Sequence, residues 1–166
     1  MEASEKIVID LTKCMANVGE KQPFEGTFSL SDSLLPYPNA HLAQATVKLN
    51  VLFLNPHVEA EGEIVCKIVG CCDRCLAETE KTEVLPFHQI FFKDNAEEDC
   101  YCYFGSKLDA TKAVCDEIAL SLPTLFLCKP DCKGLCPVCG KDLNKGECGC
   151  SREKQNVFSA LKNLKF

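Results

Sequence analysis

The stretch that decides the fold is residues 44–69, QATVKLNVLFLNPHVEAEGEIVCKIV. Apolar residues or glycine occupy every second position on each side of a central Asn-Pro pair: Ala45, Val47, Leu49, Val51 and Phe53, then Val58, Ala60, Gly62, Ile64, Cys66 and Ile68. This period of two predicts strands with one buried face, and the short turn at Asn55-Pro56 predicts an antiparallel hairpin. Three glutamates, Glu59, Glu61 and Glu63, fall on its solvated face.

Further extended segments flank this hairpin. Short strands are predicted at 6–11 and 24–30, a proline-containing loop at 31–41, and another short strand at 100–104. Residues 78–92 are also extended, but Pro86 cannot donate a backbone hydrogen bond and restricts this segment to a sheet edge or a break.

Two helices are predicted. The first is capped by Asp109, has a stripe of apolar residues and ends at Pro123; the second is capped by Asn156 and carries Val157, Leu161 and Leu164 on one face. The expected fold class is therefore α+β: mainly an antiparallel sheet or a partly closed barrel, with two helices and a Cys-rich zinc-binding C-terminal segment. We expect residues 1–127 to form a β-rich body with one helix near 110–122. Residues 128–166 form the Cys-rich segment, and its terminal helix packs on the body.

Charge divides the chain at the same place. The formal net charge is −6, yet residues 128–166 hold eight Lys/Arg against four Asp/Glu, leaving −10 for residues 1–127. An acidic total argues against a simple nucleic-acid binder, whereas a basic segment can contact phosphate. No apolar run approaches the roughly twenty residues of a membrane span, so no membrane partner is expected.

The basic segment contains six of the fourteen cysteines, in 128–150, CKPDCKGLCPVCGKDLNKGECGC. The run from Cys136 to Gly140 is typical of a metal knuckle, in which two thiolates two residues apart bind one ion. A second C-x2-C, Cys72 and Cys75, follows the hairpin directly.

Disulfides are the alternative to metal, because cysteine-dense chains are often secreted. The N-terminal MEASEKIVID has no charged region followed by an apolar one, so we expect a cytoplasmic, reducing location, where clustered C-x2-C pairs indicate metal. Paired thiolates in a short ribbon suit a closed tetrahedral zinc site better than an iron–sulfur cluster.

Two signatures together resemble one family. The first is Cys72-x-Arg74-Cys75-Leu76; the second runs from Leu120-Ser121-Leu122-Pro123 through Leu127-Cys128-x3-Cys132-Lys133-Gly134-Leu135-Cys136-Pro137-x-Cys139-Gly140-x2-Leu143-Asn144 to Cys148-x-Cys150. In order and spacing, residues 45–166 closely resemble the YceD family, whose members are described as large ribosomal RNA subunit accumulation proteins of bacteria and plastids. Their genes often neighbour one for a large-subunit ribosomal protein. The chain departs from the family at Gln155-Asn156-Val157, where many members have Asp-Pro-Arg.

Eight cysteines carry these motifs, enough for two tetrahedral zinc ions. The economical partition puts Cys136, Cys139, Cys148 and Cys150 in a local site and joins Cys72 and Cys75 to Cys128 and Cys132. An interleaved arrangement and a single zinc ion with spare thiols remain open. Of the other cysteines, Cys14, Cys66 and Cys115 are expected in the core. Cys71 is a possible additional ligand, and Cys100 and Cys102 form a C-x-C for packing or redox chemistry.

The sequence contains no catalytic constellation. His41, His57 and His88 stand alone, and no phosphate-binding glycine loop appears, so we expect a non-enzymatic protein without a small-molecule substrate. The candidates for RNA or partner contact are Arg74, Lys129, Lys133, Lys141, Lys145 and Arg152, followed by Lys154, Lys162 and Lys165.

The resemblance implies a factor in large-subunit biogenesis that supports 23S rRNA accumulation. The basic tail would contact ribosomal RNA, and the acidic body a basic large-subunit ribosomal protein. The alternatives are a cytosolic thiol-redox or metal-handling protein and a zinc-ribbon nucleic-acid-binding module. The lack of a basic recognition helix weakens the zinc-ribbon alternative.

Overall fold

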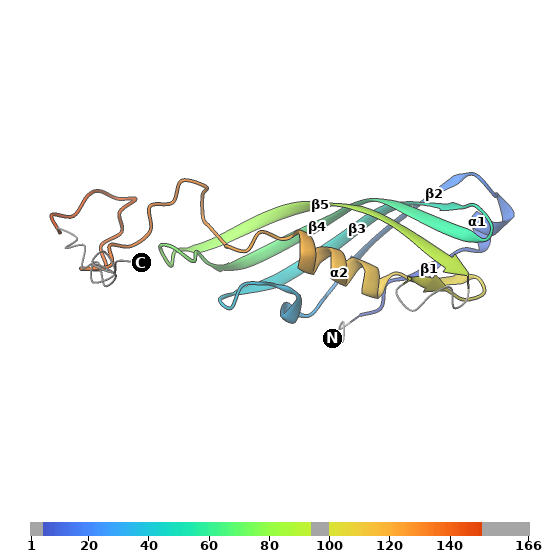
Figure 1. Cartoon of the computed structure of the whole chain (residues 1–166), viewed down its shortest axis with the longest axis horizontal. Helices are drawn as coiled ribbons and strands as arrows, with labels where there is room; N and C mark the ends of the chain where they lie inside the picture. The colour runs from blue at the N-terminus through green and yellow to red at the C-terminus, as the bar shows by residue number, and fades with distance from the viewer. Residues whose placement is uncertain (1–4, 94–99, 151–166) are drawn as a thin grey trace, which may run out of the picture.

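A computed structural model of the chain describes residues 5–93 and 100–150. A long, twisted five-stranded sheet runs along most of the molecule (Figure 1). Its strands, in spatial order, are β2 (Lys21–Phe28), β3 (Ala40–Phe53), β4 (His57–Cys71), β5 (Glu78–Lys93) and β6 (Cys102–Tyr103). Strands β2 to β5 are antiparallel neighbours, and β6 pairs parallel with the end of β5.

The predicted hairpin is confirmed as β3 and β4. Val47 pairs with Ile64 and Phe53 with Val58, and the alternating apolar side chains of both strands are buried on one face. Because the strands are 14 and 15 residues long, the hairpin spans the sheet and carries the chain from the Asn55-Pro56 turn to the opposite end. Strand β4 ends at Cys71, so the first cysteine pair, Cys72 and Cys75, follows directly after the hairpin.

The partly closed barrel is wrong, because the sheet is open. Its outermost strands, β2 and β6, do not pair with each other in the described part of the chain. At one edge β2 pairs only with β3, and at the other edge β6 contributes just two residues, Cys102 and Tyr103, which is too short a strand to close a barrel.

A second layer covers the apolar face of the sheet. It consists of β1 (Val8–Asp10) paired with β7 (Lys107–Asp109), the short helix α1 (Thr12–Ala16), the 3-10 turn η1 (Asp32–Leu34) and helix α2 (Thr111–Ser121). Helix α2 runs along the sheet (Figure 1) and packs near β5, where its Ile118 and Val114 are fully buried. This layer encloses one continuous core.

Several local predictions differ from this layer. Helix α1 and strand β7 are too short to show a period in the sequence and are not predicted. The N-cap of α2 is Ala110 rather than Asp109, although the Asp109 carboxylate accepts the Thr111 N–H at 3.0 Å. The predicted C-terminal helix, beginning at Asn156, lies outside the described residues.

Strand β5 explains how the sheet tolerates Pro86. It pairs with β4 along its whole length, with Pro86 opposite Glu63, but with β6 only at Phe92 and Lys93. Pro86 therefore lies where β5 has a strand on one side only, as the missing N–H requires. Among the helices in residues 5–93 and 100–150, none is long and apolar enough to cross a bilayer.

Candidate metal centres

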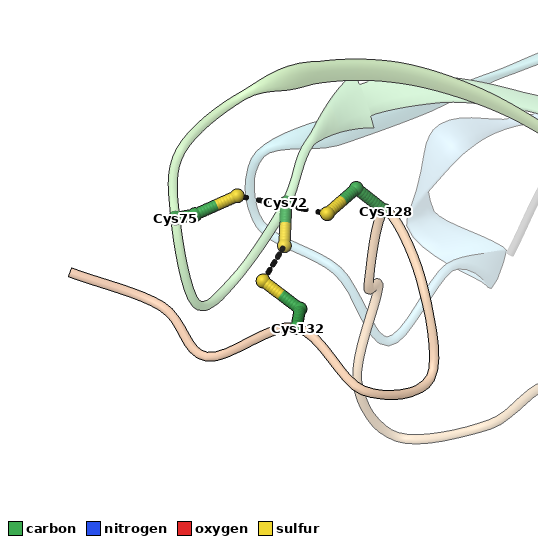
Figure 2. A group of neighbouring side chains, drawn as sticks. All are labelled: Cys72, Cys75, Cys128 and Cys132. Atoms are coloured by element: carbon green, nitrogen blue, oxygen red, sulfur yellow. Dashed lines mark hydrogen bonds between the residues drawn. The ribbon is translucent and has the colours of Figure 1, made fainter. Parts of the chain in front are cut away.

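The first group of thiols, which we call cluster 1, joins the hairpin end to the chain after α2. It consists of Cys72 and Cys75 in the turn between β4 and β5, and Cys128 and Cys132 from the segment that follows α2. Their side chains converge on one point (Figure 2). The sulfurs of Cys72 and Cys132 are 3.8 Å apart and those of Cys75 and Cys128 are 3.6 Å apart, with all four within 4.8 Å of one another.

These distances fit a tetrahedral ion. A Zn–S distance of about 2.3 Å in tetrahedral geometry separates the sulfurs by about 3.8 Å, whereas a disulfide requires about 2.05 Å. Cys72 and Cys132 are almost completely buried, and Leu127 and Leu135 pack against them. A closed, four-sulfur, water-poor site is characteristic of structural rather than catalytic zinc.

The second group, cluster 2, is local in sequence and closer to the solvent. Cys136, Cys139, Cys148 and Cys150 have all their sulfurs within 4.8 Å, and Cys139 and Cys150 are exposed. Gly140 takes a φ of +72° and donates its N–H to Cys136 O at 2.8 Å, which is the tight turn a knuckle requires. The Val138 N–H points at the Cys136 sulfur at 3.4 Å.

Backbone N–H groups favour thiolates in both clusters. Burial of the Cys72 sulfur opposes ionisation, but backbone hydrogen bonds from Cys128, Cys75 and Arg74 outweigh it and lower the pKa of Cys72 to about 6. The N–H groups of Cys139 and Val138 likewise lower the pKa of Cys136 to about 6.

Other thiols of the same clusters have raised pKa values. Burial and the neighbouring thiols raise the pKa of Cys128 to about 12. In cluster 2, hydrogen bonding with Cys139 is the largest of the causes that raise the pKa of Cys150 to about 12. A divalent cation would relieve the repulsion among thiolates this close together.

The sequence did not assign roles to the residues that bring the two halves of cluster 1 together. Asp73 donates its N–H to Phe126 O at 2.8 Å, and its carboxylate accepts the Phe126 N–H at 2.7 Å. Asn144, which is part of the family-like motif, donates its amide N–H to the Cys132 sulfur at 3.4 Å. In the sequence, only the position of Asp73 between the presumed ligands Cys72 and Cys75 indicated a role for this residue.

Arg74 has a structural contact. Its guanidinium Nη1 donates to Cys132 O at 2.9 Å, and Arg74 O accepts the Leu135 N–H at 3.0 Å. Gly134 lies so close that an added Cβ would be 2.9 Å from Arg74 O, so only glycine fits there without a shift. Arg74, a predicted RNA or partner contact, therefore ties the hairpin turn to the tail and remains exposed.

The predicted basic contact residues of the tail lie at the surface. Lys129, Lys133, Lys141 and Lys145 are exposed. Lys141 donates to Glu147 O at 2.8 Å, and Lys145 lies 3.9 Å from the Asp142 carboxylate. Arg152, Lys154, Lys162 and Lys165 lie outside the described residues.

The remaining cysteines separate into two sets. Cys14, Cys66 and Cys115 are buried in the core, as predicted. Cys71, Cys100 and Cys102 are half-buried, and none of them joins either cluster in the described structure.

Comparisons with known proteins agree with the motifs. The family model for the large ribosomal RNA subunit accumulation protein YceD matches residues 60–165. An uncharacterised Mycobacterium tuberculosis protein is 29% identical over 102 residues, which cover 57% of this chain and 49% of that protein. A chloroplastic Arabidopsis thaliana protein, large ribosomal RNA subunit accumulation protein YCED homolog 1, is 37% identical over 60 residues, 36% of this chain and 19% of that protein.

The chain spans about half the length of the mycobacterial relatives it matches, at 49% and 50% of two of them. No solved structure matches it. The family match includes all eight cysteines of clusters 1 and 2 as well as Arg74 and Asn144. The chain therefore belongs to the YceD family of large ribosomal RNA subunit accumulation proteins.

Proposed function

We propose that this protein is a non-enzymatic factor in large-subunit biogenesis that supports 23S rRNA accumulation and is held together by two structural zinc ions. Family membership supports the biological setting. The observation that supports two zinc ions is the grouping of eight cysteines into two clusters, each with four sulfurs within 4.8 Å of one another.

Zinc is favoured by the donor set. Four thiolates without an open position bind Zn²⁺ as a closed structural site and leave no place for a substrate. In cluster 1 the ion would link the turn after β4 to Cys128, across more than fifty residues of chain. Its role would be to fix the tail against the end of the sheet.

The zinc assignment is tested by elemental analysis of protein purified without added metal. We expect about two zinc ions per chain, because eight thiolates fill two tetrahedral sites. A stoichiometric iron signal with visible absorption would contradict the zinc assignment. A single zinc that survives Cys75→Ser but is lost in Cys148→Ser would restrict binding to cluster 2.

The exposed basic residues of the tail would provide the RNA contact. Lys129 and Lys133 flank Cys132, and no described acidic side chain forms an ion pair with either ammonium group. Phosphate contacts would make binding weaken with salt, each contact adding roughly one unit to the salt slope. The excess of acidic residues on the body would leave RNA contact to the tail and keep the sheet available for a basic ribosomal protein.

The cellular test depletes the protein and measures the ratio of 23S to 16S rRNA after complementation. Wild-type protein should restore the ratio, whereas Lys129→Ala/Lys133→Ala should restore it only in part. The matched control is Lys13→Ala/Lys67→Ala, which removes two exposed charges from the body. Full rescue by the tail variant would argue against RNA contact through these lysines. Crosslinking of the tagged protein in cells would then show whether the direct partner is a ribosomal protein.

A further inference from the structure

The loop of cluster 2 reaches into cluster 1. The loop between Cys139 and Cys148 folds back over residues 132–136, where Leu135 and Asp142 form an isolated antiparallel bridge. Two backbone hydrogen bonds hold it there: Leu143 N–H to Gly134 O at 2.9 Å and Cys136 N–H to Lys141 O at 2.8 Å. The two clusters are therefore joined by a folded connection.

Asn144 is the side chain at the point of contact. Its amide nitrogen donates to the Cys132 sulfur at 3.4 Å and to the Asp142 carboxylate at 2.8 Å. Its amide oxygen accepts the Lys133 N–H at 2.9 Å. Because a backbone donor faces the oxygen, the NH2 group must face the sulfur, so the orientation of the amide is determined by its partners.

A hydrogen bond to a metal-bound thiolate stabilises the charged ligand and orients it. Changes to such supporting residues typically alter metal affinity by about 10–100-fold. Asn144 is held in its loop by Asp142, which also accepts the Asn144 backbone N–H at 2.9 Å. The ends of the loop are the ligands Cys139 and Cys148 of cluster 2, so an ion there closes the loop that carries Asn144.

We infer that Asn144 couples the two clusters: metal in cluster 2 orders the loop, and Asn144 then strengthens metal binding in cluster 1 through Cys132. This inference rests on the proposed zinc binding and adds a coupling between the two sites. Metal in cluster 2 makes metal binding in cluster 1 tighter, and by linkage metal in cluster 1 tightens cluster 2 by the same factor. Asn144 is a positioning residue that acts through Cys132.

The test is a double-variant cycle on the full chain, with zinc as the probe. Zinc affinity of cluster 1 is measured by competition with a chelator in wild type, Asn144→Ala, Cys148→Ser and the double variant. The zinc lost in Cys75→Ser identifies the contribution of cluster 1. We expect Asn144→Ala to weaken cluster 1 about tenfold and Cys148→Ser to weaken it similarly. The double variant should be no weaker than Cys148→Ser alone.

Two further variants control for a disturbed loop. Glu147→Ala changes an exposed side chain of the same loop and should leave cluster 1 unchanged. Asn144→Asp keeps the size and the acceptor, loses the donor and places a charge beside the sulfur, so it should weaken cluster 1 at least as much as Asn144→Ala. Amide exchange in the β3–β4 hairpin verifies that each variant retains a folded body.

The failures of the two proposals can be distinguished. If neither cluster binds zinc, both the zinc assignment and the coupling are wrong. If both clusters load but Asn144→Ala changes the affinity of cluster 1 less than twofold, only the coupling is wrong. The same holds if the effect of Asn144→Ala keeps its full size in the Cys148→Ser background.

Discussion

Asp73 and Phe126 exchange two hydrogen bonds: the Asp73 N–H donates to Phe126 O at 2.8 Å, and the Phe126 N–H donates to the Asp73 carboxylate at 2.7 Å. Phe126 is buried, and its ring packs on Tyr37 with the centroids 5.3 Å apart. Asp73 lies between Cys72 and Cys75, and Phe126 lies two residues before Cys128. The reciprocal pair therefore aligns both halves of cluster 1 on the core.

Asp73→Ala should weaken this alignment. Loss of the carboxylate leaves a partly buried N–H without its acceptor, at a cost of about 1–3 kcal/mol. We expect a lower melting temperature and faster zinc loss from cluster 1. Asp73→Asn is the matched variant, because its amide oxygen can still accept the Phe126 N–H, and it should stay close to wild type. If both variants lose stability to the same extent, the charge of Asp73 matters here and not the hydrogen bond. If neither loses stability, the pairing with Phe126 does not align cluster 1.

Loss of one ligand from each cluster should have different effects on the body. The metal link between Cys75 in the hairpin turn and Cys128 closes a long loop of the chain. Cys75→Ser breaks this link, so the variant should have a lower melting temperature of the β-sheet and a looser tail. Cys148→Ser should disturb the tail alone when zinc is in excess, because cluster 1 then remains loaded. Calorimetry with zinc content measured for each variant makes the comparison.

The outcome against a shared site would be a Cys75→Ser protein with full zinc and an unchanged melting curve. In that case Cys72 and Cys75 would not share an ion with Cys128 and Cys132. The 3.6 Å separation between the sulfurs of Cys75 and Cys128 would then have to be explained without metal.

Thiol titration should proceed in three stages. At pH 8 the half-buried Cys71, Cys100 and Cys102 should react in the native protein. The eight cluster thiols should react only after a chelator removes the metal.

In the last stage of the titration, the three core cysteines react. Burial raises the pKa of Cys66 to about 12 and also raises the pKa of Cys14 and Cys115. A raised pKa keeps these groups as thiols at pH 8, so they should react only on unfolding. If the eight cluster thiols react at once without chelator, a thiol-redox protein would be favoured instead.

Gly62→Ala should destabilise the sheet directly. An added Cβ would lie 2.0 Å from Lys48 O on the neighbouring strand, so β3 and β4 must move apart. Forced repacking of this kind costs about 1–3 kcal/mol. Thermal unfolding should show a clear loss, with exposed Glu63→Ala as the adjacent control. A melting temperature equal to that of the control would show that the strands are less closely held here than the structure indicates.

The sequence by itself determined the β3–β4 hairpin and the cysteine pairs. Strict alternation around Asn55-Pro56 encodes a buried face, because neighbouring side chains on a strand point to opposite sides. The C-x2-C spacing encodes a metal knuckle, because two thiolates two residues apart in one turn can bind one ion. Pro86 also predicted its one-sided strand, since its missing N–H has a consequence wherever it lies.

Only the tertiary structure decided what these local units meet. Cys72 and Cys132 are 60 residues apart in the chain, and the sequence left their partition open because spacing says nothing about pairs brought together by folding. The choice between an open sheet and a barrel, the three-residue strand β7 and the roles of Asp73 and Asn144 could not be predicted from the sequence for the same reason. Each depends on contacts with a distant segment, and such contacts are settled by how the whole core packs rather than by a local period.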